Sequence, residues 1–475
     1  MLGSPAYRDK VNRITVLAAL LGLFALVPAF GPNWLLLKAN RLVAGDVYGA
    51  FSASQPYALA LLGAWALLLL VSFVRFPGRA WVLAGLCTAA LALGLLLVGG
   101  GSSTLSGGAS DPERARISLQ SGVWLTLLAY YIGTFGSLGD APQTGLTRLL
   151  MVLPGPLIAA LFIFAGTFGS VGLSQELASQ GGDFAAEVLR HLALAGTSVL
   201  LACAIGIPAA IWAARRAEAA RLVLPTASFL QTIPSLALFG IMLLPLARLG
   251  SNVTVGQALL FCLVGGLLAA GVGFLARRTS GWLQNTLTTL TLLAALLPVL
   301  LLTVIVAVIL NDLFVAVFSL DFGRLNFPKS LAAPLSSLGV RGIGTAPALI
   351  ALTLYAFLPI IRNTYTGIKE VPRAATEAGR GMGMSPGQIL RRVELPLALP
   401  LIMEGVRAST VLTIGIATVA FLIGAGGLGT FIERGISQQV PDLILLGALP
   451  IIALALLADA LLRGLGQLVT PRGLR

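Results

Sequence analysis

The sequence predicts an all-α polytopic membrane protein, on the grounds of its composition, its long apolar runs and the placement of its charges. Of 475 residues, 57% are hydrophobic and only 10% are charged, whereas soluble domains carry about 25% charged residues. A soluble protein of this length could not cover its surface with so few charges. The mean hydropathy of +0.94 likewise indicates that lipid is the solvent for most of the chain.

Charge and cysteine usage exclude several other classes of protein. The net charge is +13, which in a soluble protein would suggest nucleic-acid binding. Membrane proteins gather Arg and Lys in cytoplasmic loops, and no nucleic-acid module is recognisable, so no nucleic-acid partner is expected. Cys87, Cys203 and Cys262 lie in apolar runs without a CxxC or Cys/His cluster. Neither a disulfide framework nor a metal site is therefore predicted.

Hydropathy predicts about twelve transmembrane helices. Crossing about 30 Å of hydrocarbon takes about 20 mostly apolar residues. With the N-terminus placed inside, about 20 Lys and Arg fall in inner loops and about 10 in outer ones, which predicts cytoplasmic N- and C-termini. The predicted spans are 14–36, 57–74, 80–99, 118–138, 146–168, 191–213, 222–247, 256–276, 284–310, 345–361, 398–424 and 441–461.

These spans fall into sections. A leading transmembrane block, 1–188, holds the first five and ends in a polar stretch. A second section, 189–466, holds the others. Residues 250–344 interrupt it with two helices and an outer loop rich in Pro, Ser and Gly, and 467–475 form a cytoplasmic tail. The sequence assigns no role to the leading block or to the interruption.

The longest inner loop, 362–396, is too polar for lipid and too regular for a slack linker. Pro372 is at a favourable position for opening a helix, and Ser385-Pro386 is typical of the start of a second one. Gly381 and Gly383 separate the two. Small residues on the first helix would let another protein approach its backbone closely: Ala374, Ala375, Ala378 and Gly379. The loop is predicted to be a helix–turn–helix on the inner membrane face.

One motif in this loop is specific. Glu377-Ala378-Gly379, then Gly383, then Val393-x-Leu395-Pro396 resembles the EAA loop of ABC importer permeases, with matching spacing. Gly379 in place of the second Ala and Val393 in place of Ile are the departures, and both are conservative in size. The stretches 191–211, 231–246, 351–368 and 423–432 resemble the glycine betaine, choline and proline permeases, in particular a longer subgroup with extra N-terminal helices.

The resemblance implies a type I ABC importer permease core in 189–466. The chain would be the membrane-spanning permease subunit of an ATP-driven importer in the bacterial inner membrane, for osmoprotectants such as glycine betaine, choline or proline. In that family the loop docks on the ATPase. The residues implied in that coupling are Glu377, Ala378, Gly379, Gly383, Met384, Leu395 and Pro396.

Partners and cofactors follow from the same resemblance. A Walker A loop ends in Gly-Lys-Ser/Thr, and none of the four lysines follows a glycine. No catalytic residue is assigned, and the chain is not expected to be an enzyme. ATP and Mg would bind the partner ATPase, with no cofactor in this chain. The other expected partners are an extracytoplasmic substrate-binding protein and a second permease chain, identical or homologous.

Three further signals are weighed against structural roles. Gly424–Gly429 matches GxGxxG but follows a predicted membrane helix rather than a strand, so a turn or close helix packing is favoured over nucleotide binding. His191, the sole histidine, is expected to be a polar interface residue near the outer surface. Glu404 and Arg407 share a helix face. The two residues could form an ion pair that braces the loop or could line the pore, and the sequence supports both roles equally. Asp459 is expected at the interface.

Two other functions fit the sequence less well. An ion-driven secondary transporter would show ionisable residues at the midplane and a twofold repeat, and it would leave the EAA loop unexplained. A membrane-embedded enzyme would need a nucleophile and base at suitable spacing, and none is found. The sequence leaves open the exact substrate, the residues lining its path and whether the permease pair is a homodimer or a heterodimer.

Overall fold

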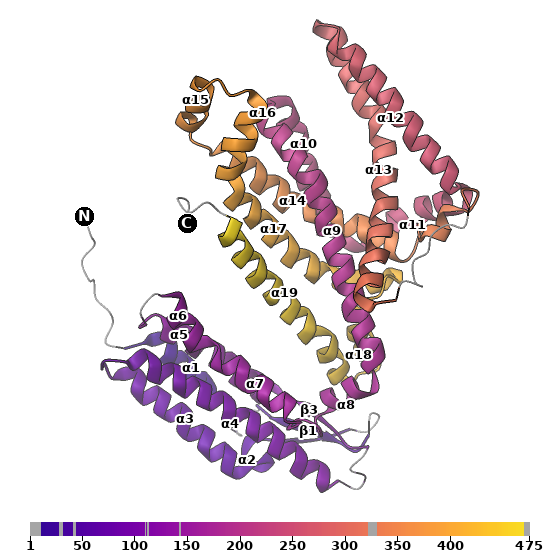
Figure 1. Ribbon diagram of the computed structural model, residues 1–475. Helices are drawn as coiled ribbons and strands as arrows, with labels where there is room; N and C mark the ends of the chain where they lie inside the picture. The colour runs from indigo at the N-terminus through magenta and orange to yellow at the C-terminus, as the bar shows by residue number, and fades with distance from the viewer. Residues whose placement is uncertain are drawn as a thin grey trace. The chain divides into compact units, whose positions relative to one another are not determined.

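Helices dominate the computed structural model, which describes residues 11–27, 32–40, 44–109, 111, 114–141, 144–321 and 330–469 (Figure 1). Lipid offers no partner to a backbone N–H or C=O, so each must bond within its own segment, as a helix allows. Among the described residues, ten helices are long and apolar enough to cross a membrane. The chain forms two compact units, Met1–Gly181 with Gly435–Leu446, and Gly182–Arg434 with Gly447–Arg475.

The first unit packs helices around two buried tryptophans. Trp65 fills the space beside Gly22, where a Cβ would come 2.3 Å from the indole, and Trp34 does the same beside Gly122 at 2.4 Å. The Trp34 Nε1–H donates to the Ala25 carbonyl at 2.8 Å. The elements from this part of the chain are α1 Arg13–Phe24, β1 Leu35–Lys38, β2 Asp46–Tyr48, α2 Ala50–Ala53, α3 Gln55–Phe73, α4 Arg79–Gly107, β3 Arg116–Leu119, α5 Ser121–Leu138, α6 Gly145–Val152, α7 Pro154–Phe164 and α8 Gly172–Ser179.

A small antiparallel sheet with the order β2-β1-β3 belongs to the same unit. Leu35 on β1 lies opposite Tyr48 on one side and Leu119 on the other. These strands are not predicted from the sequence. Segments of three or four residues are too short to show a clear alternation, and β3 pairs with a strand about eighty residues earlier, so no local pattern predicts the sheet.

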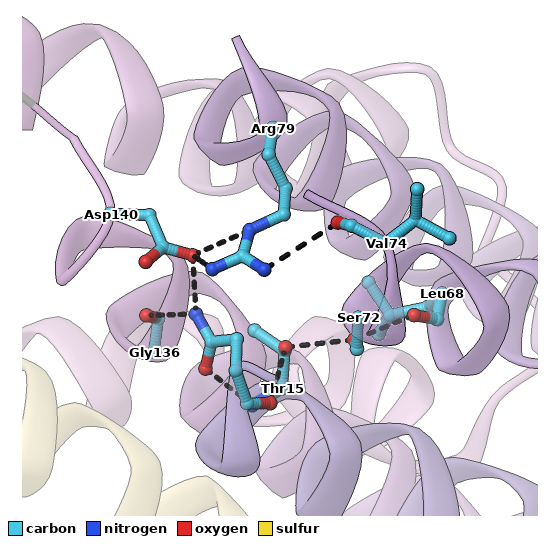
Figure 2. A network of polar contacts seen from close by, with 8 residues as sticks. Thr15, Leu68, Ser72, Val74, Arg79, Gly136 and Asp140 are labelled. Carbon is cyan, nitrogen blue, oxygen red and sulfur yellow. Dashed lines mark hydrogen bonds and ion pairs between the residues drawn. The ribbon is translucent and has the colours of Figure 1, made fainter. Parts of the chain in front are cut away.

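A buried ion pair holds one end of this helix bundle (Figure 2). Arg79, at the start of α4, donates from Nε and Nη2 to one carboxylate oxygen of Asp140 at 3.0 and 2.6 Å. Asn12 donates to the same oxygen at 2.9 Å and to the Gly136 carbonyl at 3.0 Å. Arg79 is 7% exposed and Asp140 19%. Removing these two charges from water costs free energy, and the attraction between the Arg79 guanidinium and the Asp140 carboxylate offsets that cost.

The second unit contains the remaining helices. They are α9 Gly181–Arg215, α10 Ala217–Thr232, α11 Ser235–Asn252, α12 Val255–Arg277, α13 Gly281–Ser319, α14 Thr345–Lys369, α15 Arg373–Gly381, α16 Pro386–Ile389, α17 Leu395–Ile416, α18 Gly429–Ser437 and α19 Pro441–Val469. Short 3-10 segments η3 (Leu335–Leu338) and η5 (Ala417–Ile423) and a π-helical turn η4 (Leu390–Glu394) lie among them. Residues of α18 and α19 at 435–446 belong to the first unit.

Helices α12 and α13 form an antiparallel hairpin (Figure 1). Glycines on α12 let the two backbones approach closely. A Cβ on Gly265 would come 2.3 Å from Pro298, and one on Gly273 would come 3.3 Å from Thr291. These two contacts fix the register of the hairpin, which makes up most of the 250–344 interruption.

The ten candidate spans differ from the predicted set of about twelve in three places. Among the described residues of the predicted span 14–36, the helix is α1, of 12 residues, and Leu35 and Leu36 belong to strand β1. The span 118–138 corresponds to α5, whose buried residues are mostly Gly, Ser and Thr, and it is not among the ten. The span 222–247 breaks at Ile233 because the following proline disfavours a helical residue before it. The orientation of the termini stays a prediction, and residues 1–10 and 470–475 lie outside the described part.

The Arg79–Asp140 pair is expected to matter for stability. Asp140→Ala removes the carboxylate and leaves a buried guanidinium with reduced compensation, which costs about 3 kcal/mol. Thermal unfolding of the purified protein in detergent micelles measures the loss. Asp111→Ala is the matched control, since Asp111 pairs with Arg114 on the surface, where the side chains are 47% and 80% exposed, and its removal should cost at most about 0.5 kcal/mol. Equal losses for both variants would contradict the prediction.

Candidate functional site

The segment with the EAA-like motif begins with helix α15. Pro372 occupies the position just before the helix, with an extended backbone. The helix ends in a Schellman turn: the Gly383 N–H donates to the Arg380 carbonyl at 2.9 Å, and the Met384 N–H donates to the Gly379 carbonyl at 3.1 Å. Gly383 has φ +76°, a conformation that glycine adopts at no steric cost. The turn therefore explains why residue 383 is a glycine.

A second short helix, α16, follows directly. The Ser385 side chain accepts from the Gln388 N–H at 3.4 Å, and the Gln388 side chain accepts from the Ser385 N–H at 2.8 Å. This is a capping box, with Pro386 in the first turn. The chain continues through η4 into α17. The helix–turn–helix predicted from Pro372, Gly383 and Ser385-Pro386 is confirmed.

The loop packs against itself around Gly379. This residue is buried, and a Cβ placed on it would lie 3.5 Å from Ile389, 3.5 Å from the Met384 sulfur and 3.8 Å from Val393. Met384 is half-buried, whereas Glu377, Ala378 and Gly383 are exposed. The residues singled out from the sequence therefore divide into an inner group and a surface group.

The base of the loop rests on neighbouring helices. Leu395 packs in a cluster with Ala214, Ile368 and Ala398, and Pro396 lies in the first turn of α17. Arg215, the last residue of α9, donates from Nη2 to the Glu394 carboxylate at 2.9 Å and to the Pro386 carbonyl at 3.3 Å. The loop is thus attached at both ends to membrane helices, and no motif in the sequence indicates the contribution of Arg215.

The GxGxxG match forms a tight turn between η5 and α18. Gly424, Gly426 and Gly427 have φ of +73°, +78° and +93°. The Gly427 N–H donates to the carboxylate of Glu187, and a Cβ on Gly427 would lie 3.2 Å from the His191 ring. A 3-10 helix, not a strand, precedes the glycines. The arrangement is therefore a close-packed turn and lacks the strand that a dinucleotide fingerprint needs.

The predicted span 191–213 put His191 at the start of a helix, but α9 extends from Gly181 to Arg215. His191 is fully buried inside α9, and its Nε2 lies 3.0 Å from the Ile414 carbonyl. Because α9 already begins at Gly181, its first ten residues separate His191 from the helix end. Within the described ranges, no group of three His, Cys, Asp or Glu side chains could hold a metal ion.

Glu404 and Arg407 form an ion pair at 2.7 Å, as their spacing suggested. The pair extends to a second helix, because Arg407 Nε lies 3.0 Å from Asp459, which also pairs with Arg463 at 2.7 Å. The i,i+3 and i,i+4 pairs are readable from the sequence. The bridge between α17 and α19 is not, since it joins residues about fifty apart.

Comparison with known proteins finds a family match for each of two parts of the chain. Residues 262–472 match the family described as binding-protein-dependent transport system inner membrane component, and residues 12–174 match the N-terminal domain of the ABC transporter permease YehY. The first match begins inside the 250–344 interruption, and the predicted division of the chain into domains stays a prediction.

Characterised relatives are permeases. The glycine betaine/carnitine/choline transport system permease protein OpuCB of Bacillus subtilis is 46% identical over 146 residues, which are 31% of this chain and 67% of that one. The osmoprotectant import permease protein OsmW of Salmonella typhimurium is 47% identical over 145 residues, 30% of this chain and 67% of its own. A solved structure of the MetNI methionine ABC transporter aligns over 46% of this chain and 95% of that one, at 23% identity and a TM-score of 0.26. The chain belongs to the family of multi-pass inner-membrane permease components of ABC transport systems.

Proposed function

We propose that this permease imports small osmoprotectants of the quaternary-ammonium or zwitterionic kind, such as glycine betaine, choline or proline. The names of the relatives support this choice, since they include permeases for glycine betaine, carnitine and choline. A soluble binding protein on the outer face would deliver the substrate. A second permease chain, identical or homologous, would complete the path.

The energy for import would come from partner ATPase subunits, which bind ATP and Mg. The loop α15–α16 would dock on them. The observation that carries this proposal is the geometry of that loop: Glu377, Ala378 and Gly383 are exposed on an element braced by a Schellman turn, a capping box and Arg215. A rigid element with defined attachments can transmit a discrete movement from one protein to another.

The inner group of loop residues would act differently from the surface group. Gly379 and Met384 hold α15 against Ile389, and Leu395 and Pro396 fix the start of α17. A displacement of the exposed face by the ATPase would thus move α17 as well, because the loop does not change its internal packing. The same segment also carries the exposed Arg373, Arg380, Arg391 and Arg392, and these charges favour an acidic rim on the partner.

The first experiment tests for these partners. The protein is solubilised gently from its native membrane and captured, and the proteins that accompany it are identified by mass spectrometry. Recovery of a Walker-type ATPase, with or without a second EAA-containing permease, supports the proposal and distinguishes a homodimer from a heterodimer. Purification of the chain alone, with solute transport that continues without ATP, would favour an ion-driven secondary transporter.

Gly383→Asp is expected to uncouple transport. Asp tolerates a positive φ better than most residues, and no atom lies within 4 Å of a Cβ at this position, so folding and insertion should persist. A charge left unpaired at a protein contact costs about 1–3 kcal/mol, so uptake should fall about tenfold or more. Uptake of radiolabelled glycine betaine, with permease levels checked in the same membranes, provides the measurement. Full uptake by this variant would refute the assignment of the loop.

Gly379→Ala is the matched glycine substitution in the same loop, and it should leave uptake unchanged. The added methyl group would meet its neighbours at ordinary contact distances, and replacing a helical Gly by Ala stabilises a helix by up to about 1 kcal/mol. Hydrogen exchange across 373–389 should slow correspondingly. A loss of uptake at normal permease levels would mean that Gly379 itself is part of the docking contact.

A further inference from the structure

One short segment links the N-terminal part of the chain to its last helix. Residues Gly435–Leu446 lie in the stretch that matches the inner membrane component family, yet they fold within the first unit together with Met1–Gly181. The segment contains the end of α18 and the start of α19. The N-terminal unit therefore includes the residues from which the last membrane helix begins.

Asp442, the second residue of α19, is the centre of this arrangement. It is 2% exposed, and its Oδ2 accepts a hydrogen bond from the Ser118 hydroxyl of β3 at 2.6 Å. The same carboxylate lies against the backbone of Gly172, the first residue of α8: a Cβ on Gly172 would come 2.4 Å from Oδ2 and 2.8 Å from Cγ. Three elements that are distant in the sequence, β3, α8 and α19, thus meet at one carboxylate.

Electrostatics explain why an acid is suited to this position. The first N–H groups of a helix carry partial positive charge, and the residue before α8, Val171, offers no side-chain cap. Asp442 lies at the start of α8 and in the first turn of α19. β3 also carries Arg116, and α8 carries the buried Glu176. The nearest charged atoms of these two side chains are 4.0 Å apart. Arg116 attracts the Asp442 carboxylate, whereas Glu176 repels it, so the hydrogen bond from Ser118 and the start of α8 are the contacts that hold the buried Asp442.

The other end of α19 is tied to α17. Arg407 Nε lies 3.0 Å from Asp459, and α17 begins at Leu395, where the coupling loop ends. Asp442 and Asp459 are about 25 Å apart along the helix at 1.5 Å per residue. A single helix therefore carries one polar attachment near its start and another toward its end.

We propose that Asp442 is a positioning residue that fastens the start of α19 to β3 and α8, so that the N-terminal unit provides the fixed end of a helix whose far end moves with the coupling loop. This role rests on the proposed coupling function. It assigns a task to the N-terminal block: without a fixed end, movement of α17 would displace α19 as a whole instead of tilting it about its start.

The test uses the full chain with its partner subunits in proteoliposomes, in two independent variants. Asp442→Ala removes the carboxylate, and Gly172→Ala displaces it by placing a methyl group where it lies. Asp183→Ala is the control, because Asp183 is an exposed acid in the first turn of α9. The readouts are glycine betaine taken up per ATP hydrolysed, and hydrogen exchange of 172–179 and 435–446.

Each of the two variants should lower uptake per ATP several-fold, with ATP hydrolysis retained and with faster exchange in both segments. The double variant should be no worse than Asp442→Ala, since both changes remove the same contact. Wild-type uptake per ATP, or losses that multiply, would overturn the proposal. If Asp442→Ala does not reach the membrane, Ser118→Ala, which removes the donor of the hydrogen bond to Asp442, takes its place with the same two outcomes.

The design separates this inference from the proposed function. If wild-type protein takes up no glycine betaine, the substrate assignment fails, whereas the exchange readout still reports whether Asp442 holds the two segments. If wild-type uptake is normal and exchange in the variants is unchanged, the positioning role fails and the importer assignment stands.

Discussion

Polar groups that a chain carries into hydrocarbon must find their partners within the protein, because lipid supplies none. For the backbone, the solution is the long helix, and ten such helices account for most of the described residues. Charged side chains at the ends of the helices are paired across elements in the same way: Arg79 with Asp140, Arg215 with Glu394, and Arg407 with Asp459. These pairs lie where elements distant in the sequence meet, so the requirement for satisfied charges also specifies which helices pack together.

The loop between α14 and α17, outside the spans, is likewise held by polar contacts within the protein. Local hydrogen bonds at the end of α15 and the start of α16 give it a defined shape, and Arg215 attaches it to α9. It offers small and exposed positions to a partner while its own contacts lie inward. Rigidity and accessibility are thereby combined in the 25 residues between Lys369 and Leu395.

Sequence reasoning succeeded where the determining interactions are local. Pro372, Gly383 and Ser385-Pro386 act on their immediate neighbours, so the two short helices and the turn between them could be predicted. The contact of Asp442 with Ser118 joins residues 324 apart in the sequence, and no periodicity or motif marks such a pair. The same holds for the sheet and for Arg407–Asp459. Hydropathy predicted two more spans than the ten candidates among the described residues, because α5 buries mostly Gly, Ser and Thr and because α1 has only 12 residues.

The register of the α12–α13 hairpin has a consequence for its depth in the bilayer. α13 has 39 residues, about 58 Å at 1.5 Å per residue, which exceeds the about 40–45 Å of a bilayer with its headgroups. Since Gly265 faces Pro298 and Gly273 faces Thr291, α12 begins opposite about residue 308, and α13 continues for about 16 Å beyond it. That extension carries Asn311 and Asp312. Both residues lie within Leu297–Ser319, the stretch of α13 that is long and apolar enough to cross a membrane, so the length of α13 in excess of a bilayer lies before Leu297.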